Sequence, residues 1–358
     1  MLGHDSGAIY NGCMALWDFD VSRSGSMAVG SPDGNGHVLA PLYAPIADDL
    51  ERARQLFDDT LFSDFPFINE LSAYVQGYRG KMLRPALLLL TGRAVGEVTD
   101  VHNALAAVVE MIHVATLLHD DVLDHADLRR RRPTVSALHG NEAAVLLGDY
   151  LVSQAYHLCS SVAGRHASCR IGAATTTVCE GELMQIHHRG NSDLTEAEYY
   201  EIVNRKTAAL TAVCGELGAH FAGASDQAVR AMEAFGRLVG VAFQIVDDVL
   251  DIAGTEAEMG KTLGRDLDLG KPTLPTIHCL RRGEPAVARR LASVLGNGSR
   301  APAAQVRDWL HQSGSLQYAM ERAGGFLGEA VEHLRVLRPG PARDSLAGVA
   351  HFMVHRQR

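Results

Sequence analysis

Aromatic residues and net positive charge are both scarce in this sequence of 358 residues. Phe, Trp and Tyr together make up 6% of the chain, and the formal net charge is -9 at pH 7. Proteins that bind nucleic acids usually present a basic surface, often with aromatic side chains on which bases stack. The composition therefore argues against a nucleic-acid partner. If this acidic chain binds phosphates, it must do so locally, through metal ions and a few well-placed cations.

Cysteine patterns and targeting signals are also missing. The six cysteines include no C-x-x-C pair and no zinc-type Cys/His spacing, which predicts free thiols in a reducing compartment. We find no apolar run long enough to cross a bilayer, and no charged N-terminal segment followed by an apolar one, as in a signal peptide. We therefore expect a soluble cytoplasmic protein with at most peripheral membrane contact.

Lysine is nearly absent. Lysine and arginine together number 33, yet only four are lysines: Lys81, Lys206, Lys261 and Lys271. A base composition that favours arginine codons explains most of this bias. The remaining lysines then mark positions where arginine will not serve, because an ammonium and a planar guanidinium are not interchangeable at a crowded phosphate site.

Apolar residues recur every three or four positions through most of the chain, which predicts an all-α fold. Residues 1–38 are rich in Gly, Ser and Asp and are expected to form a disordered tail. Residues 39–358 are expected to form one helical domain, with the helical pattern starting at Pro45. The predicted helices are 46–60, 99–124, 141–163, 170–188, 195–220, 226–252, 273–281, 285–296, 301–313, 316–336 and 341–355.

The pentapeptide DDVLD occurs twice, at 120–124 and 247–251, each time after a long apolar helical segment. At about 100° per residue, the three aspartates of each copy share one face of their helix. The carboxylates within such a cluster repel one another, and their burial costs free energy. A solvated helix end without a function could explain one such cluster, but it is a poor explanation for two identical ones. Oxygen-only ligand sets suit Mg²⁺, which prefers carboxylates together with substrate phosphates. Two facing clusters could therefore hold several Mg²⁺ ions around one diphosphate and assist its departure.

Other polar residues lie close to these two motifs. The same helical wheel places His113 and Thr116 on the stripe of the first motif, and Gln244 under the second. His113 could instead be a core histidine, but its place on the stripe favours contact with a ligand. Arginines 129–132 follow the first motif closely enough for at least two of them to bind phosphate, although such a run is usually a solvated face.

The motifs, in this order, resemble those of the trans-type isoprenyl diphosphate synthases, over about residues 45–356. The matching stretches are GKMLRP at 80–85, EMIH at 110–113, DDVLD with RR at 120–130, GDYL at 148–151, GEL with Gln185 at 181–185, KT at 206–207, FQIVDDVLD at 243–251 and GKTLGRDLDLGKPTLP at 260–275. All four lysines fall on motif positions. The sequence departs from the family at Arg79 and Arg131, where glycine is common, and at Met82, where a basic residue is commoner.

The resemblance implies a helical bundle around a central cavity, usually a homodimer, with two adjacent diphosphate sites. About three Mg²⁺ ions would be bound by the two aspartate motifs, that is, by Asp120, Asp121, Asp124, Asp247, Asp248 and Asp251. The allylic diphosphate would also contact three cations, with a fourth in a closing segment: Arg129, Lys206, Lys261 and Lys271. Isopentenyl diphosphate would be bound by Lys81, Arg84, His113 and Arg130.

The implied reaction is ionisation of the allylic diphosphate, 1'-4 condensation and loss of a proton to the departing pyrophosphate. Lys206, Thr207 and Gln244 would act in catalysis, the latter two by stabilising the allylic cation with oxygen dipoles. No protein base is then needed.

Product length should depend on residues one helical turn before the first motif. In the family, bulky aromatic residues there stop growth early. Ala115 and Thr116 are small, so we expect an open tunnel and a product of about thirty or more carbons, plausible as a quinone side chain. Replacement of both by Phe should shorten it.

Three alternatives remain open from the sequence. A shorter-chain synthase, of geranylgeranyl or geranylfarnesyl type, would share every motif. A class I terpene cyclase would not need Lys81, Arg84 and His113 for a second diphosphate, and seldom carries two DDxxD copies. A non-catalytic partner subunit would usually have lost aspartates or lysines that this chain keeps.

Overall fold

The computed structural model describes residues 36–253, 264–297 and 301–355. Most of the expected N-terminal tail and Lys261 lie outside these residues. Residues Leu39–Arg358 form one compact unit.

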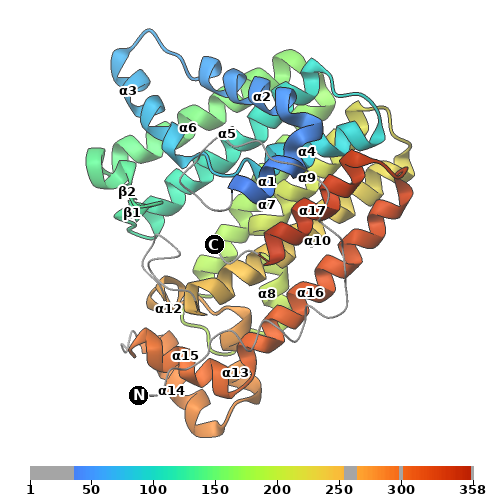
Figure 1. The fold of residues 1–358 in the computed structure, drawn as a ribbon. Coiled ribbons are helices and arrows are strands. Elements are labelled where there is room, and N and C mark those ends of the chain that lie inside the picture. The colour runs from blue at the N-terminus through green and yellow to red at the C-terminus, as the bar shows by residue number, and fades with distance from the viewer. Residues whose placement is uncertain (1–35, 254–263, 298–300, 356–358) are drawn as a thin grey trace. The chain divides into compact units, whose positions relative to one another are not determined.

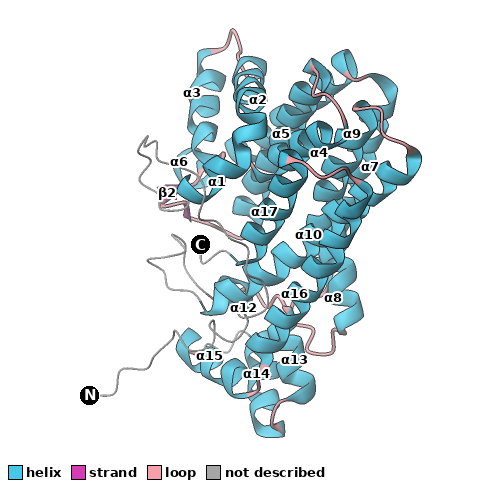
Figure 2. Ribbon diagram, turned by 45° about the vertical axis from the view of Figure 1, so that its right-hand side comes forward, coloured by secondary structure: helices cyan, strands magenta, loops and turns pink. Residues whose placement is uncertain are grey.

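Helices make up nearly all of the described chain (Figures 1 and 2), as the periodicity predicts. The α-helices are α1 (Gly36–Tyr43), α2 (Ala47–Thr60), α3 (Pro66–Val75), α4 (Leu83–Val95), α5 (Asp100–Leu123), α6 (Val135–Val162), α7 (Gly164–His187), α8 (Glu196–Val203), α9 (Ala209–Phe221), α10 (Asp226–Ala253), α12 (Arg265–Asp268), α13 (Leu274–Arg282), α14 (Pro285–Asn297), α15 (Ala303–Gln312), α16 (Ser315–His333) and α17 (Pro341–His355). The shorter elements are η2 (Ala44–Ile46), η3 (Gln76–Tyr78), η4 (Asn204–Ala208), η5 (Leu334–Val336), β1 (Leu128–Arg129) and β2 (Arg132–Pro133).

The structure departs from the sequence prediction in several places, and α6 and α7, for example, begin at Val135 and Gly164 rather than at 141 and 170. Helix α1 begins before Pro45, α3 and α4 were not predicted, and residues 128–133 form a small hairpin. Helix α4 was not predicted because residues 85–92 are all buried, so that the sequence has no polar face from which the helical period could be recognised.

Helix α5, which carries the first aspartate motif, is a central core helix. It packs against α2, α4, α6 and α9, and its N-terminus is closed by a capping box between Thr99 and His102. By length and composition α5 could cross a membrane, so the expectation that no run is long enough was wrong. However, 78% of its most apolar window is buried inside the protein, as expected for a helix surrounded by other helices.

Helix α10, which carries the second motif, lies against α9 with very little space between the two backbones. A Cβ atom added at Gly236 would overlap the carbonyl of Thr211, and one at Gly215 would overlap the carbonyl of Met232. Glycine is therefore required for this close crossing. This close crossing positions the C-terminal part of α10, and α10 also contacts η4.

A second, smaller core lies where α10 ends. It is formed by buried residues of α10, α12, α13, α14 and α15, namely Ile252, Leu267, Cys279, Leu291, Leu295, Val306 and Leu310. Helices α13, α14 and α15 lie together at the bottom of Figures 1 and 2. This core supports the segment that follows the second motif.

The close crossing of α9 and α10 predicts opposite effects for two glycine-to-alanine substitutions. Gly236→Ala should lower the free energy of unfolding by about 1–3 kcal/mol, because the added methyl displaces a backbone. Gly324→Ala, at an exposed position of α16 with nothing within 4 Å, should raise it by up to about 1 kcal/mol, because alanine is the better helix former. Urea denaturation measures both, and a loss of stability in both variants would contradict the prediction.

Candidate active site

The first aspartate motif sits at the C-terminal end of α5 and is tied to neighbouring side chains. Asp121 is 1% exposed, and its carboxylate accepts hydrogen bonds from the Tyr78 hydroxyl (2.9 Å) and Arg129 Nε (2.8 Å). Asp124 ends the helix and accepts from Lys271 Nζ at 2.9 and 2.8 Å and from Arg189 at 3.3 Å. These contacts hold carboxylates that would otherwise repel one another.

The second motif repeats this arrangement near the end of α10. Asp248 is 5% exposed and accepts hydrogen bonds from the Tyr199 hydroxyl (2.7 Å) and Gln244 Nε2 (2.8 Å). Asp251 is 1% exposed and accepts from the backbone N–H of Asp266 at 3.2 Å. In both motifs, therefore, the second aspartate is bound by a tyrosine hydroxyl.

The sequence did not reveal Tyr78, Tyr199 or Arg189. Tyr78 lies 43 positions from Asp121, and Tyr199 lies 49 positions from Asp248. No spacing rule connects residues so far apart, and a tyrosine is not otherwise typical of a carboxylate cluster. Only the folded chain identifies them.

The segment 264–271 links the two motifs. Lys271, whose side chain is 4% exposed, binds Asp124 of the first motif, and the backbone N–H of Asp266 donates to Asp251 of the second. The guanidinium of Arg265 also donates to the backbone carbonyl of Asp124. The described part of the predicted closing segment, from residue 264 onward, thus contacts both motifs.

Lys206 and Thr207 lie on η4, a single π-helical turn between α8 and α9. Such turns are frequent at functional sites. Helix α7 passes so close that a Cβ on Gly181 would lie 2.8 Å from the Cα of Lys206. The ammonium of Lys206 binds Glu182 and donates to Gln185 Oε1 at 2.8 Å. The sequence resemblance included these two residues, and the structure shows that they orient Lys206.

Thr207 and Gln244, predicted to act together, are in contact. The Thr207 hydroxyl donates to Gln244 Oε1 at 2.7 Å, and the amide of Gln244 donates in turn to Asp248. This chain fixes the orientation of both side-chain dipoles. Phe243, beside Gln244, is half-buried and packs against the core.

A second group of cations surrounds the buried carboxyl of Glu110, which is 2% exposed. Burial raises the pKa of Glu110, while the positive charges of Arg84 and Arg130 oppose that rise. The pKa of His113 is held well below its usual range by burial and by the same two arginines, so its imidazole is neutral. The structure therefore brings together three of the four residues predicted to bind isopentenyl diphosphate, and Glu110 compensates their charge.

The arginine run folds into a tight hairpin. Residues 129 and 132 pair as the strand ends, and the two loop residues, Arg130 and Arg131, have φ of 51° and 63°. Such a two-residue turn favours glycine or asparagine because left-handed backbone strains other residues. Arg131, where the resemblance leads us to expect glycine, thus has a backbone conformation that glycine would adopt without strain.

The aspartate motifs fit a divalent cation by their chemistry. Burial raises the pKa of Asp120, and burial together with the charge of Asp266 raises the pKa of Asp248 to about 8. Hard cations would stabilise the ionised forms of these oxygen ligands. Within the described residues, no three His, Cys, Asp or Glu side chains converge on one point, and Tyr, Arg and Lys side chains bind several of the aspartates. The fit to Mg²⁺ therefore rests on the donor set.

The electrostatics of Lys206 follow from the same charges. Burial alone would lower the pKa of its ammonium, but Asp120 and Glu182 outweigh burial and raise it. Lys206 is thus a permanent cation facing the first motif.

The two positions predicted to set product length differ in their surroundings. Ala115 is fully buried in the core. Thr116 is half-buried, and its hydroxyl donates to the carbonyl of His113 at 2.7 Å. Of the two, only Thr116 therefore has exposed surface.

Comparison with known proteins identifies the family. Residues 65–311 match the model of the polyprenyl synthetases. The chain is 35% identical over 314 residues to the octaprenyl diphosphate synthase of Escherichia coli, an alignment that covers 87% of this chain and 97% of that protein. It is 36% identical over 294 residues to the geranylgeranyl diphosphate synthase of Methanosarcina mazei, covering 80% and 89%.

A solved structure agrees with the helical architecture predicted from the sequence. The polyprenyl synthase of Caulobacter crescentus, complexed with calcium and isoprenyl diphosphate, superposes with a TM-score of 0.86 at 31% identity, covering 93% of this chain and all of that one. The match of the family model over most of the chain and the similarity to nearly complete relatives lead to one conclusion. The chain belongs to the polyprenyl synthetase family.

Proposed function

We propose that this prenyltransferase condenses isopentenyl diphosphate with an allylic diphosphate and extends the product to about thirty or more carbons. The observation that carries the proposal is the pair of aspartate motifs joined by the segment 264–271, together with a separate cation group near Glu110. Two diphosphates need two such groups. A cyclase, which ionises one diphosphate, would have no use for the second.

Mg²⁺ fits the aspartate motifs, and polyprenyl synthetases use it. We assign its binding, by about three ions, to both motifs. When bound, it would neutralise the diphosphate and make it a better leaving group. The calcium bound to the Caulobacter relative supports a divalent cation at this kind of site.

The chain's own residues would bind the two substrates and stabilise the allylic cation. Lys206 and Arg129 would bind the allylic diphosphate, with Lys261 and Lys271 closing over it. Thr207 and Gln244, held in a fixed chain of hydrogen bonds, would present oxygen lone pairs to the developing allylic cation. Lys81, Arg84, His113 and Arg130 would bind isopentenyl diphosphate.

The proposed product length rests on the small residue Thr116, which is partly exposed one helical turn before the first motif. The octaprenyl synthase relative supports a long product, and the geranylgeranyl synthase relative supports a short one. We favour the long product because neither Thr116 nor Ala115 can act as a bulky floor.

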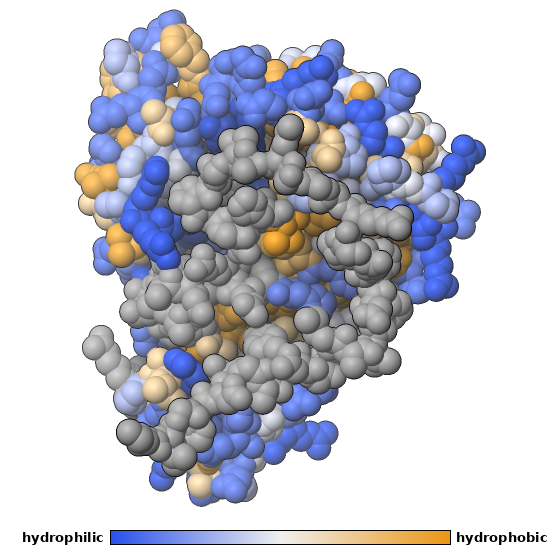
Figure 3. Space-filling view, in the orientation of Figure 1, coloured by the Kyte–Doolittle hydropathy of each residue, from blue (hydrophilic) through white to orange (hydrophobic). Residues whose placement is uncertain are grey.

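We also propose a homodimer formed through α6, and a cytoplasmic location with at most peripheral membrane contact. Helix α6 exposes Leu138 (51%), Val145 (38%) and Leu146 (67%) on the side not packed against α5. Apolar side chains also gather at the top of Figure 3, over the α2–α3 connection, where Phe62 is 71% exposed. Exposed apolar surface of this kind usually marks an interaction site.

The reaction predicts that purified protein will incorporate labelled isopentenyl diphosphate into farnesyl diphosphate only with Mg²⁺. Asp247→Asn should lower kcat about a hundredfold or more, because it removes a ligand of the proposed metal site. Asp226→Asn, an exposed change at the other end of α10, is the matched control and should leave kcat unchanged. Equal rates for both variants, or full activity in EDTA, would contradict the proposed site.

Product length should respond to Thr116→Phe more than to any change in the core. We expect this variant to fold normally and to make a shorter product, because the ring fills the space beneath the motif. Ala115→Phe should instead destabilise the protein, by about 1–3 kcal/mol or more, because position 115 has no room. Chromatographic sizing of the products and thermal unfolding test the pair. An unchanged product from a folded Thr116→Phe variant would place the floor elsewhere.

The proposed dimer predicts that Leu146→Glu will dissociate the protein into monomers, because it buries a charge in the α6 interface. Light scattering after size exclusion measures the mass. Leu183→Glu, an exposed leucine on α7, tests whether the interface extends to that helix. A wild-type protein that is monomeric when active would rule the dimer out.

A further inference from the structure

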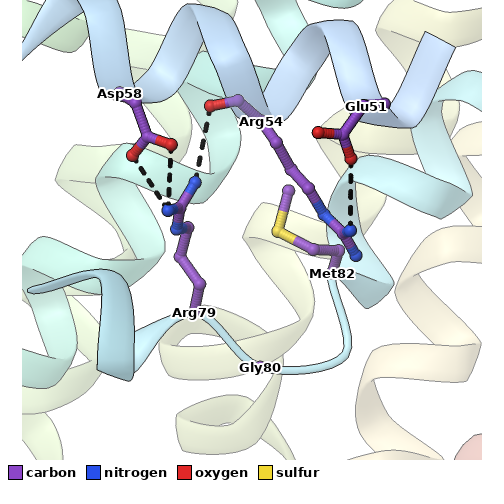
Figure 4. Close-up of a pocket in the computed structure, with 6 residues that line it drawn as sticks. All are labelled: Glu51, Arg54, Asp58, Arg79, Gly80 and Met82. Atoms are coloured by element: carbon purple, nitrogen blue, oxygen red, sulfur yellow. Dashed lines mark hydrogen bonds and ion pairs between the residues drawn. The ribbon is translucent and has the colours of Figure 1, made fainter. Parts of the chain in front are cut away.

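The turn that carries Lys81 is held from outside the active site. Residues 79–82 connect η3 to α4 and pass beneath α2, and a cavity of about 310 Å³ lies between them (Figure 4). Its walls include Arg54, Arg79, Gly80 and Met82. Figure 4 shows Arg79 rising from the turn to α2, whereas Arg54 reaches down from α2 and pairs with Glu51.

Arg79 binds α2 at three points. Its guanidinium forms an ion pair with Asp58 (2.9 and 3.1 Å to the two carboxylate oxygens) and donates to the backbone carbonyl of Arg54 at 3.4 Å. It also lies over the ring of the fully buried Phe57, 4.9 Å from the centroid. The Arg79 side chain is only 14% exposed, so these contacts are shielded more than those of a typical surface pair.

The rest of the turn needs such an anchor. Met82 has a left-handed backbone, with φ of 51°, and its side chain is 2% exposed. Strain of this kind persists only where surrounding contacts fix the backbone. Tyr43 supplies one contact by donating its hydroxyl to the carbonyl of Lys81 at 2.7 Å. Phe352 of α17 supplies another, with its ring centroid 4.8 Å from Lys81 Nζ.

The turn also supports a second phosphate-binding cation. The guanidinium of Arg130 lies against Gly80, where an added Cβ would be 2.6 Å from Nη1 and 2.7 Å from Cζ. A shift of the turn would therefore move Lys81 directly and Arg130 through this contact. Both belong to the group proposed to bind isopentenyl diphosphate.

We propose that Arg79 is a positioning residue that sets the affinity for isopentenyl diphosphate by anchoring the Lys81 turn to α2. The inference rests on the proposed function, because it assumes that Lys81 and Arg130 bind that substrate.

The test compares two arginines of the same cavity. Arg79→Gln should raise KM for isopentenyl diphosphate about tenfold, and leave kcat and KM for the allylic diphosphate nearly unchanged, because a loosened turn misplaces only one diphosphate site. Arg54→Gln removes the same charge but keeps the backbone carbonyl that Arg79 binds, so it should leave all three parameters unchanged. Equal rises in the two variants would show that charge, not anchoring, matters and would overturn the proposal.

The partner carboxylate provides an independent check. Asp58→Asn should raise KM for isopentenyl diphosphate in the same direction as Arg79→Gln but by less, because it removes only the ion pair and leaves the contacts of Arg79 with the Arg54 carbonyl and the Phe57 ring. The double variant should be no worse than Arg79→Gln alone, because both changes act through the same anchor. Arg79→Lys should recover part of the affinity. An unchanged KM in folded Arg79→Gln protein would overturn the anchor while leaving synthase activity intact, whereas an inactive wild type would refute the proposed function itself.

Discussion

Buried carboxylates at the ends of two apolar helices are the constraint on which the rest of the site depends. Asp121, Asp248 and Asp251 are each at most 5% exposed, and charge in such places is costly unless it is paired. The protein meets this constraint with matched donors: a tyrosine hydroxyl for the second aspartate of each motif, the Lys271 ammonium for Asp124 and the backbone N–H of Asp266 for Asp251. The same buried negative charge is what makes a divalent cation favourable there.

The helices around the site are arranged to keep these charges in place. Close glycine contacts hold α10 against α9 and α7 against η4. They restrict the backbone positions of the helix that carries Asp248 and of the turn that carries Lys206. At the second group of cations, the buried Glu110 carboxyl lies within the electrostatic influence of Arg84 and Arg130. One bundle thus carries two separate groups of charged side chains, the aspartate motifs and the cations near Glu110.

The sequence predicted this architecture well where a pattern was local. The period of the long helices, the repeated DDVLD and the four lysines could be read directly, because each depends on neighbours within a few positions. Tyr78, Tyr199, Arg189 and Glu110 could not be assigned, since their partners are distant in the chain. Helix α4 was missed because a helix that is buried on all sides shows no alternation of polar and apolar residues. The length of α5, which would suffice for a membrane span, was also not recognised from the sequence.

The central claim is that the aspartate motifs bind a diphosphate through divalent cations. Calorimetric titration with a non-ionisable allylic diphosphate analogue, at increasing Mg²⁺ concentrations, tests it most directly. The account predicts weak binding in EDTA and an affinity that rises with Mg²⁺ and then saturates. Equal affinity with and without Mg²⁺ would contradict it, since the cations of the chain alone would then suffice.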